Sequence, residues 1–217
     1  QAAASGAGVP LIDEHAAAVG DIGGGTTNVA TIVSGSIIAS RAARIGSSDI
    51  DTAIMDRLRR HRGLTIGIPS AERLKLELSS AIEPRDPAKR INVRGRDVQT
   101  GAPSAVDISA SEVYAVTLPI IRRISDEISQ MLTELAPEVA GDIYDRGVIL
   151  TGGGALLDGL PQYLQKQLSL SVRVADEPRY AIVRGLSQLF EEPLLLRRVA
   201  RTEPHAFIDA EATAFEA

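Results

Sequence analysis

The chain contains no cysteine and no tryptophan, and its 217 residues include only three Phe and four Tyr. Without cysteine it can form no disulfide, thiolate nucleophile or cysteine metal site, which fits a reducing cytoplasm. With so few aromatic rings, the core must be built from Ile, Leu, Val and Ala. For the same reason, stacking of a base on an aromatic ring is not expected to be the main contact to a ligand.

Basic residues are not in excess either: 23 Lys and Arg stand against 28 Asp and Glu, a formal net charge of −5. That balance argues against a nucleic-acid partner. No apolar run approaches the roughly 20 residues that span a bilayer, and the N-terminus lacks the pattern of a signal peptide, so we expect a soluble chain. His15, His61 and His205 share no helical face and indicate neither a metal site nor a catalytic base.

A glycine triplet stands between two apolar runs near the N-terminus. Asp21 lies at the end of the first run, Gly23–Gly25 follow, and Thr26 and Thr27 lead into the second. Glycines allow a tight turn whose amides can approach an anion, and Asp21 is placed to hold a hydrated Mg²⁺ beside a phosphate. Neither a Walker A loop nor a dinucleotide fingerprint fits this segment. A glycine-rich hairpin turn without any ligand is the alternative interpretation.

A second glycine triplet, Gly152–Gly154, follows the apolar run at residues 148–151. The pattern predicts a strand, a glycine turn and then a helix that begins near Ala155. The free amides and the positive dipole end of such a helix would point toward an anion above the glycines. Two triplets at the ends of predicted strands favour a paired phosphate site over two unrelated turns.

The periodicity of apolar residues predicts an α/β fold with a mixed sheet. It indicates a three-strand meander, a helix ending at Gly63, a small α+β insertion, a long helix beginning at Ser109 or Ser111, and then alternating strands and helices. This order is that of a ribonuclease-H-like half-domain. After the meander at 16–44, the predicted elements are helices at 70–82, 155–168 and 180–190 and strands at 91–97, 105–108, 147–151 and 172–175.

We divide the chain into four parts on this basis. Residues 1–15 have little periodicity and are predicted to be a linker, and the mixed polar tail is predicted to be disordered. The parts are the linker at 1–15, a core of 16–62 and 106–197, an insertion at 63–105, and the tail at 198–217.

Asp-Ile-Gly-Gly-Gly-Thr-Thr at 21–27, paired with Leu-Thr-Gly-Gly-Gly-Ala at 150–155, resembles the phosphate and adenosine motifs of the actin, sugar-kinase and chaperone ATPase superfamily. Within that superfamily the chain is most similar to the MreB family, the rod-shape-determining bacterial actin homologues. The similarity keeps the family's order from about Gly6 to Glu191. Its supporting segments are 42–46, 49–54, 71–75, 93–97 and 143–147.

The resemblance implies an actin-type half, with the core as subdomain IIA and the insertion as subdomain IIB. It implies ATP and Mg²⁺ as cofactors, with Asp21 as a catalytic residue that acts through magnesium-bound water. It also implies self-association into filaments, the cell-wall elongation machinery as a partner, and a cytoplasmic filament associated with the inner membrane. The residues that it assigns to the nucleotide are Gly23, Gly24, Gly25, Thr26, Thr27, Glu72, Lys75, Gly152, Gly153, Gly154 and Ala155.

Family members are longer than this chain. The resemblance implies that a separate phosphate loop, the glutamate thought to activate the attacking water, and the membrane-contacting surface all belong to a missing first half. We therefore expect either a fragment or a short paralogue, and ATP hydrolysis by the chain stays open. A non-polymerising kinase or chaperone-type ATPase of the superfamily is one alternative, although the compact insertion favours the actin branch. An inert folded half with little nucleotide affinity is another.

Glu72 and Lys75 are three residues apart on a predicted helix and therefore share a face. Spacing alone favours a solvated ion pair between them. The resemblance instead places both beside the adenine and ribose. Ser79, one turn further along, stands where the relatives usually have Gly, so its hydroxymethyl group would crowd or hydrogen-bond the adenosine.

Overall fold

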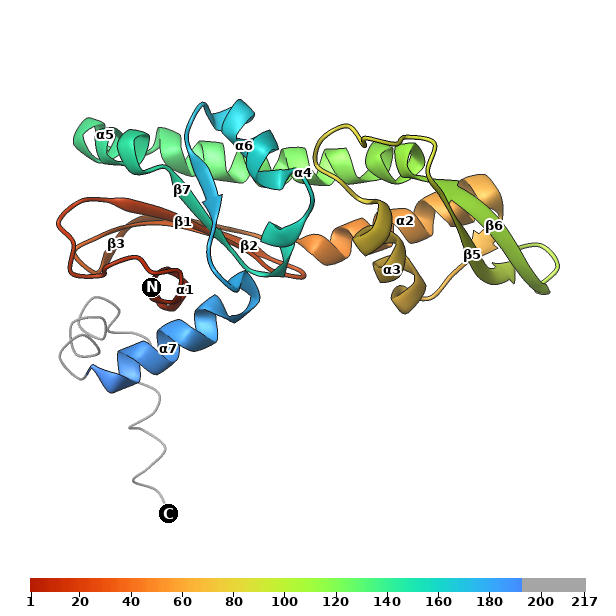
Figure 1. Cartoon of the computed structure of the whole chain (residues 1–217), viewed down its shortest axis with the longest axis horizontal. Coiled ribbons are helices and arrows are strands. Elements are labelled where there is room, and N and C mark those ends of the chain that lie inside the picture. Colours follow the sequence, from red (N-terminus) through yellow and green to blue (C-terminus); the bar gives the residue numbers. More distant parts are fainter. Residues whose placement is uncertain (193–217) are drawn as a thin grey trace, which may run out of the picture.

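The computed structural model describes residues 1–192, which form two β-sheets joined by helices (Figure 1). The larger sheet has five strands in the order β3-β2-β1-β7-β8. Its first three strands form an antiparallel meander, and β7 and β8 extend it in parallel with β1, so the predicted mixed sheet is confirmed. The strands are β1 (Ala17–Ile22), β2 (Thr27–Val33), β3 (Ser36–Ala43), β7 (Val148–Thr151) and β8 (Val172–Val174).

The smaller sheet is antiparallel, with the order β4-β5-β6. Its strands are β4 (Leu64–Thr65), β5 (Arg90–Asp97) and β6 (Pro103–Ser109), of which β4 is too short to have been predicted from the sequence. Helices α2 (Ser47–Arg62) and α4 (Ala110–Thr133) run between the two sheets, and α3 (Ile68–Leu78) packs beside α2 (Figure 1). Two helices therefore connect the predicted insertion to the rest of the fold.

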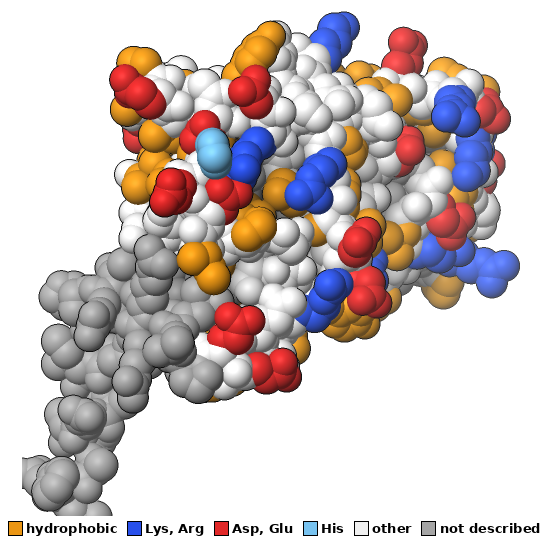
Figure 2. All heavy atoms as spheres, turned by 60° about the vertical axis from the view of Figure 1, so that its left-hand side comes forward, with side chains coloured by type: hydrophobic (Ala, Val, Ile, Leu, Met, Phe, Trp, Pro, Cys, Tyr) orange, Lys and Arg blue, Asp and Glu red, His pale blue; other side chains and the backbone are white. Residues whose placement is uncertain are grey.

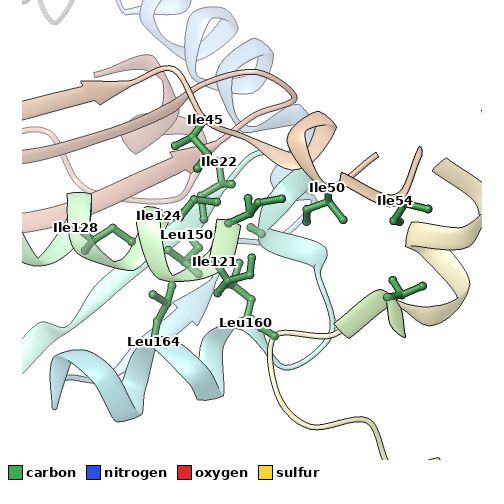
Figure 3. Packing of buried hydrophobic residues seen from close by; sticks show 14 of the residues in the cluster. Ile22, Ile45, Ile50, Ile54, Ile121, Ile124, Ile128, Leu150, Leu160 and Leu164 are labelled. Carbon is green, nitrogen blue, oxygen red and sulfur yellow. The ribbon is translucent and has the colours of Figure 1, made fainter. Parts of the chain in front are cut away.

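One face of the large sheet is covered by α4, whose predicted apolar stripe is buried. Ile121, Ile124 and Ile128 are each at most 1% exposed, and they point toward Ile22 and Leu150 of the sheet (Figure 3). The helix begins where expected, because the Ser109 hydroxyl accepts a hydrogen bond from the Glu112 amide, and the Glu112 carboxylate accepts one from the Ser109 amide. Burial of this stripe fixes the position of the sheet relative to the helices.

The opposite face of the sheet is covered in part by α1 (Ala2–Gly6) and α7 (Ala181–Glu191). Residues 1–15 are predicted to be a linker, but Ala4, Val9 and Leu11 are at most 7% exposed and belong to a second apolar cluster. Helix α1 crosses α7 so closely that a Cβ atom at Gly6 would overlap the Ala181 carbonyl. The sequence does not predict this helix, because it has no recognisable apolar stripe. Its small residues instead allow close packing of the backbone.

Two further helix predictions need correction. Helix α5 (Pro137–Arg146) was not predicted, and the helix predicted at 155–168 is divided into a 3₁₀ turn, η1 (Gly153–Leu156), and α6 (Leu160–Leu168). The division follows from an extended Leu157 and from Gly159, which adopts a left-handed conformation with φ +70°. The helix predicted at 70–82 ends at Leu78, because Ser80 turns into a parallel bridge with Asp158.

The surface is mixed in character. Acidic, basic and hydrophobic side chains are interspersed over the face shown in Figure 2. Among residues 1–192 no helix combines the length and the apolar composition that crossing a bilayer would need. The tail predicted at 198–217, and the last residues of the predicted core, lie outside the described part of the chain.

Candidate functional site

The two glycine triplets leave the large sheet at the same edge. Strands β1 and β7 are parallel neighbours, and Asp21 pairs with Thr151 in their register. The Thr151 hydroxyl donates a 3.0 Å hydrogen bond to Oδ1 of Asp21. The turns at 23–25 and 152–154 therefore begin side by side, as the two motifs predict, although many residues separate them in the sequence.

In the first turn, the carbonyl groups are hydrogen-bonded to the start of α2, and residues 24–26 are exposed. Gly23 donates its amide to the Thr26 carbonyl at 2.8 Å, and the first amides of α2, those of Ser47 and Ser48, donate to the carbonyls of Gly23 and Gly24 at 3.0 and 2.8 Å. Residues 24–26 are exposed, and no hydrogen bond within residues 1–192 engages their amides. These three amides are thus available donors on a turn whose carbonyls are fixed by α2.

Thr27 does not share this surface. Its side chain is 1% exposed, and its hydroxyl donates a 2.8 Å hydrogen bond to the Ile45 carbonyl. The resemblance assigns both Thr26 and Thr27 to the nucleotide, but only Thr26 lies at the exposed side of the turn. The Thr27 hydroxyl instead ties the start of β2 to the loop that leads into α2.

The second turn is packed tightly against the end of β1. Gly152 adopts φ +82° and donates its amide to the Pro178 carbonyl at 2.9 Å. A Cβ atom there would overlap the Ile22 carbonyl and lie 2.8 Å from Oδ1 of Asp21, and one at Gly154 would overlap the Ile22 side chain. The glycines at both positions are therefore required by the close approach of two backbones. The helix dipole predicted at Ala155 is not found there, because α6 begins only at Leu160.

A cavity of about 310 Å³ lies between the second turn and α3. It brings Glu72, Lys75 and Ser79 together with Gly153 and Gly154, as predicted, whereas the first turn adjoins it only through the flanking residues Ile22 and Ser47. The lining residues are Ile22, Ser47, Ile50, Glu72, Lys75, Leu76, Ser79, Ile121, Ile124, Gly153, Gly154, Leu156, Leu157, Asp158, Leu160 and Arg179.

Lys75 forms an ion pair with Asp51 of α2 rather than with Glu72. Its Nζ lies 2.7 Å from Oδ2 of Asp51 and 3.4 Å from the Ser47 carbonyl, and the two side chains are only 11% and 8% exposed. No local sequence pattern indicates this pair, because the two partners lie on different helices. Lys75 thereby connects the wall of the cavity to the start of α2, which also holds the first glycine turn.

Ser79 is accommodated by α4 rather than by a ligand. It is 7% exposed, and its hydroxyl lies 3.3 Å from the hydroxyl of Thr117, which is fully buried. The hydroxymethyl group predicted to crowd an adenosine therefore has a partner inside the protein, although Ser79 still lines the cavity.

Asp21 is the candidate metal residue. It is half-buried at the end of β1, and within residues 1–192 no group of three or more His, Cys, Asp or Glu could hold a metal ion. A single carboxylate cannot by itself surround a cation with protein ligands. It does fit Mg²⁺, which keeps several waters and is commonly bound by one or two carboxylates together with phosphates of a ligand.

Comparison with known proteins gives a consistent result. A family model described as MreB/Mbl protein matches residues 1–198. The cell shape-determining protein MreB of Escherichia coli K12 is 38% identical over 190 residues, which cover 88% of this chain and 54% of that protein. The cell shape-determining protein Mbl of Bacillus subtilis 168 is 35% identical over 189 residues, which cover 87% of this chain and 56% of that protein.

Solved structures support the same fold. MreB5 of Spiroplasma citri bound to ADP superimposes with a TM-score of 0.83 at 30% identity, over 89% of this chain and 58% of that one. A MamK double helical filament matches with a TM-score of 0.71 at 21% identity, over 88% of this chain and 57% of that one, which shows the shared fold alone. The chain thus spans about half the length of the curated relatives it matches.

Proposed function

The chain belongs to the MreB/Mbl family, and from this premise we propose that it is a nucleotide-binding part of an actin-like, filament-forming protein that determines cell shape. The relatives named MreB and Mbl are cell shape-determining proteins, and the similar MreB5 structure contains ADP. ATP with Mg²⁺ is the proposed ligand. A kinase or chaperone-type ATPase of the same superfamily is the alternative that the tests below address.

The observation that carries this proposal is the meeting of two glycine turns across the β1–β7 pair, where the Thr151 hydroxyl bonds to Asp21. The free amides of Gly24, Gly25 and Thr26 would bind the β- and γ-phosphates. The backbone from Gly152 to Ala155 would pass beneath the α-phosphate and adenosine, while Glu72 and Lys75 would border the ribose and base.

Asp21 would hold Mg²⁺ through water. The bound ion would neutralise phosphate charge and fix the position of the waters around it. The protein's own part is to orient the Asp21 carboxylate, which the Thr151 hydroxyl does by donating to one of its two oxygens. The substitution Asp21→Asn would keep an oxygen that can accept the Thr151 hydrogen bond and would remove the negative charge.

Amide chemical shifts test the nucleotide site. Titration of the chain with Mg-ADP is expected to shift the resonances of residues 23–26 and 152–155, together with those of Glu72 and Lys75. Because the site is open on one side, we expect weak binding, which this measurement still registers. Absence of any shift would reject the nucleotide function, and shifts confined to the apolar groove around Leu132 and Tyr144 would reject the site.

Filament formation is tested separately by sedimentation with ATP, on the longest form of the protein that its gene encodes. We expect ATP-dependent pelleting, and we expect Asp21→Asn to weaken it, because the variant lacks the carboxylate that would hold Mg²⁺ through water. Phosphorylation of a small substrate without any sediment would instead identify the protein as a kinase of the same superfamily.

A further inference from the structure

The cavity beside the second glycine turn contains few charged groups for a site proposed to bind a polyanion. Four charged side chains line it: Glu72 and Asp158 are acidic, and Lys75 and Arg179 are basic. A nucleotide adds several negative charges, of which a bound Mg²⁺ would offset only part, so a cation of the protein that is not already neutralised would favour binding. Which of the two cations can do so is decided by their partners.

Lys75 is already neutralised. Its Nζ is 2.7 Å from the Asp51 carboxylate, and both side chains are about nine-tenths buried. Breaking this pair to bind a phosphate would leave Asp51 as a buried charge without a partner, which is strongly unfavourable. One carboxylate oxygen of Asp51 already makes no hydrogen bond, so Asp51 depends on Lys75 for its compensation. Lys75 therefore stabilises the wall of the cavity rather than supplying a free charge.

Arg179 is held beside the second turn by the backbone. The Pro178 carbonyl, one residue before it, accepts the 2.9 Å hydrogen bond from the Gly152 amide. The Arg179 side chain runs along Gly153, where a Cβ atom would lie 3.9 Å from both Cγ and Nε of the arginine. The short helix η2 (Pro178–Tyr180) begins after Glu177, a non-glycine residue in the left-handed region with φ +47°. Such conformations persist where the surroundings impose them, often at ligand sites.

Arg179 also has no competing partner. It is exposed, and within residues 1–192 no ion pair or hydrogen bond of its guanidinium is formed. Arg184, five residues further along the chain, differs in this respect, because it donates hydrogen bonds to the Asp176 carbonyl at 3.2 Å and to the Glu177 carboxylate at 3.5 Å. Arg179 is thus the one uncompensated cation among the residues that line the cavity.

We propose that the Arg179 guanidinium binds the phosphate group nearest the nucleoside and so provides the positive charge that Lys75 cannot. This inference rests on the proposed nucleotide function and adds to it a residue that no motif indicated. Guanidinium groups suit the task because they remain charged and present a planar set of donors that matches phosphate oxygens. Arg179 would act together with the backbone of Gly153, which has no side chain to stand between the turn and the arginine.

The test compares the affinities of the intact chain and of variants for Mg-ADP and for adenosine, which lacks phosphate. Arg179→Ala is expected to weaken ADP binding about tenfold or more, as for loss of a hydrogen bond to a charged group. Adenosine binding is expected to stay unchanged, and Arg179→Lys is expected to restore part of the loss. Arg94→Ala is the matched control. Arg94 is also exposed and lies outside the cavity, and its substitution removes the same charge.

Each other outcome has a defined meaning. Equal losses for ADP and adenosine would overturn the phosphate assignment in favour of stacking on the base, and no loss for either would exclude contact. If adenosine does not register with any form of the chain, Mg-pyrophosphate replaces it as the comparison, and an unchanged affinity for pyrophosphate in Arg179→Ala would overturn the phosphate assignment. If the unmodified chain fails to bind ADP, the proposed function fails with this inference, whereas a normal wild-type titration with an unchanged Arg179→Ala variant rejects this inference only. Urea unfolding checks that the variant is folded.

Discussion

The two glycine triplets have the same sequence, but the physical reasons for glycine differ between them. In the second turn, a Cβ at Gly152 or Gly154 would overlap Ile22, and Gly152 also needs a positive φ. In the first turn, a Cβ at Gly25 would meet nothing within 4 Å, and one at Gly24 would meet only the Ser48 hydroxyl, at 3.3 Å. Gly152 and Gly154 of the second triplet are therefore required by the fold, whereas the structure of the protein alone does not explain Gly24 and Gly25 of the first.

This difference supports assigning the first turn to a ligand. Exposed glycines cost conformational entropy on folding, and open space would have admitted alanine at lower cost. The amides of residues 24–26 also make no hydrogen bond within the described chain. An unpaired amide is unfavourable only where water is excluded, and it can bind an anion that approaches it. A turn that is open in this way fits a requirement for close backbone contact with phosphate oxygens.

The largest effect is expected where the second turn is broken. Gly152→Ala should destabilise the protein by about 2–4 kcal/mol, because it combines a left-handed conformation with overpacking against the Ile22 carbonyl. Urea unfolding followed by circular dichroism measures this loss. The matched control is Gly153→Ala, since Gly153 has no positive φ and its nearest atoms lie 3.9 Å from the added Cβ. Equal stability of the two variants would contradict the packing explanation for the second triplet.

An intermediate effect, on binding rather than folding, is expected in the first turn. Gly25→Ala should change stability by no more than about 0.5 kcal/mol, since the added methyl group enters open space. The same methyl group should weaken Mg-ADP binding several-fold, because it stands between the backbone and the ligand. Calorimetric titration or ligand-detected NMR measures the binding, and urea unfolding measures the stability. A variant that loses stability but binds normally would reverse the distinction between the two turns.

Much of the fold could be predicted from the sequence because it is encoded locally. The meander, the long helix and its capping box follow from strand propensity, from apolar spacing in α4 and from Ser109 with Glu112. The pairing of the two glycine motifs was also predictable, since parallel strands bring their carboxyl ends to one edge. The resemblance to a family also predicted that Glu72 and Lys75 lie near the second glycine turn, and both line the cavity beside it.

What the sequence could not predict depends on contacts between distant elements. The Asp51–Lys75 pair joins two helices, and Arg179 reaches the cavity only because the Gly152 amide bonds to the Pro178 carbonyl. The inward position of Thr27 depends on the Ile45 carbonyl, which no local pattern indicates. Helix α1 falls in a segment predicted to be a linker, because its burial depends on α7, at the other end of the described chain.

The smallest effect concerns acid stability, which we expect to be independent of both turns. Asp13 lies before β1, at the end of the strand opposite to the turns, and its Oδ2 is 2.7 Å from Nη1 of Arg146. The hydrogen bond from the His15 amide, followed by the contact with Arg146, holds the pKa of Asp13 well below its usual range. A carboxylate with a lowered folded-state pKa stabilises the protein above the unfolded-state pKa, and this stabilisation is lost as the pH falls through the folded-state value.

The stability of the protein should therefore begin to decrease below about pH 4, the usual pKa range of aspartate, as protonation of Asp13 in the unfolded state becomes favourable. Asp13→Asn should reduce the slope of this decrease and leave the slope above pH 5 unchanged, which urea midpoints measured from pH 2 to 7 would show. Gly25→Ala and Gly152→Ala retain Asp13 and should follow the wild-type slope, the latter from a lower starting stability. A changed acid slope in either glycine variant would mean that the turn is coupled to the opposite end of β1. In that case the two turns could no longer be treated as separate from the rest of the sheet.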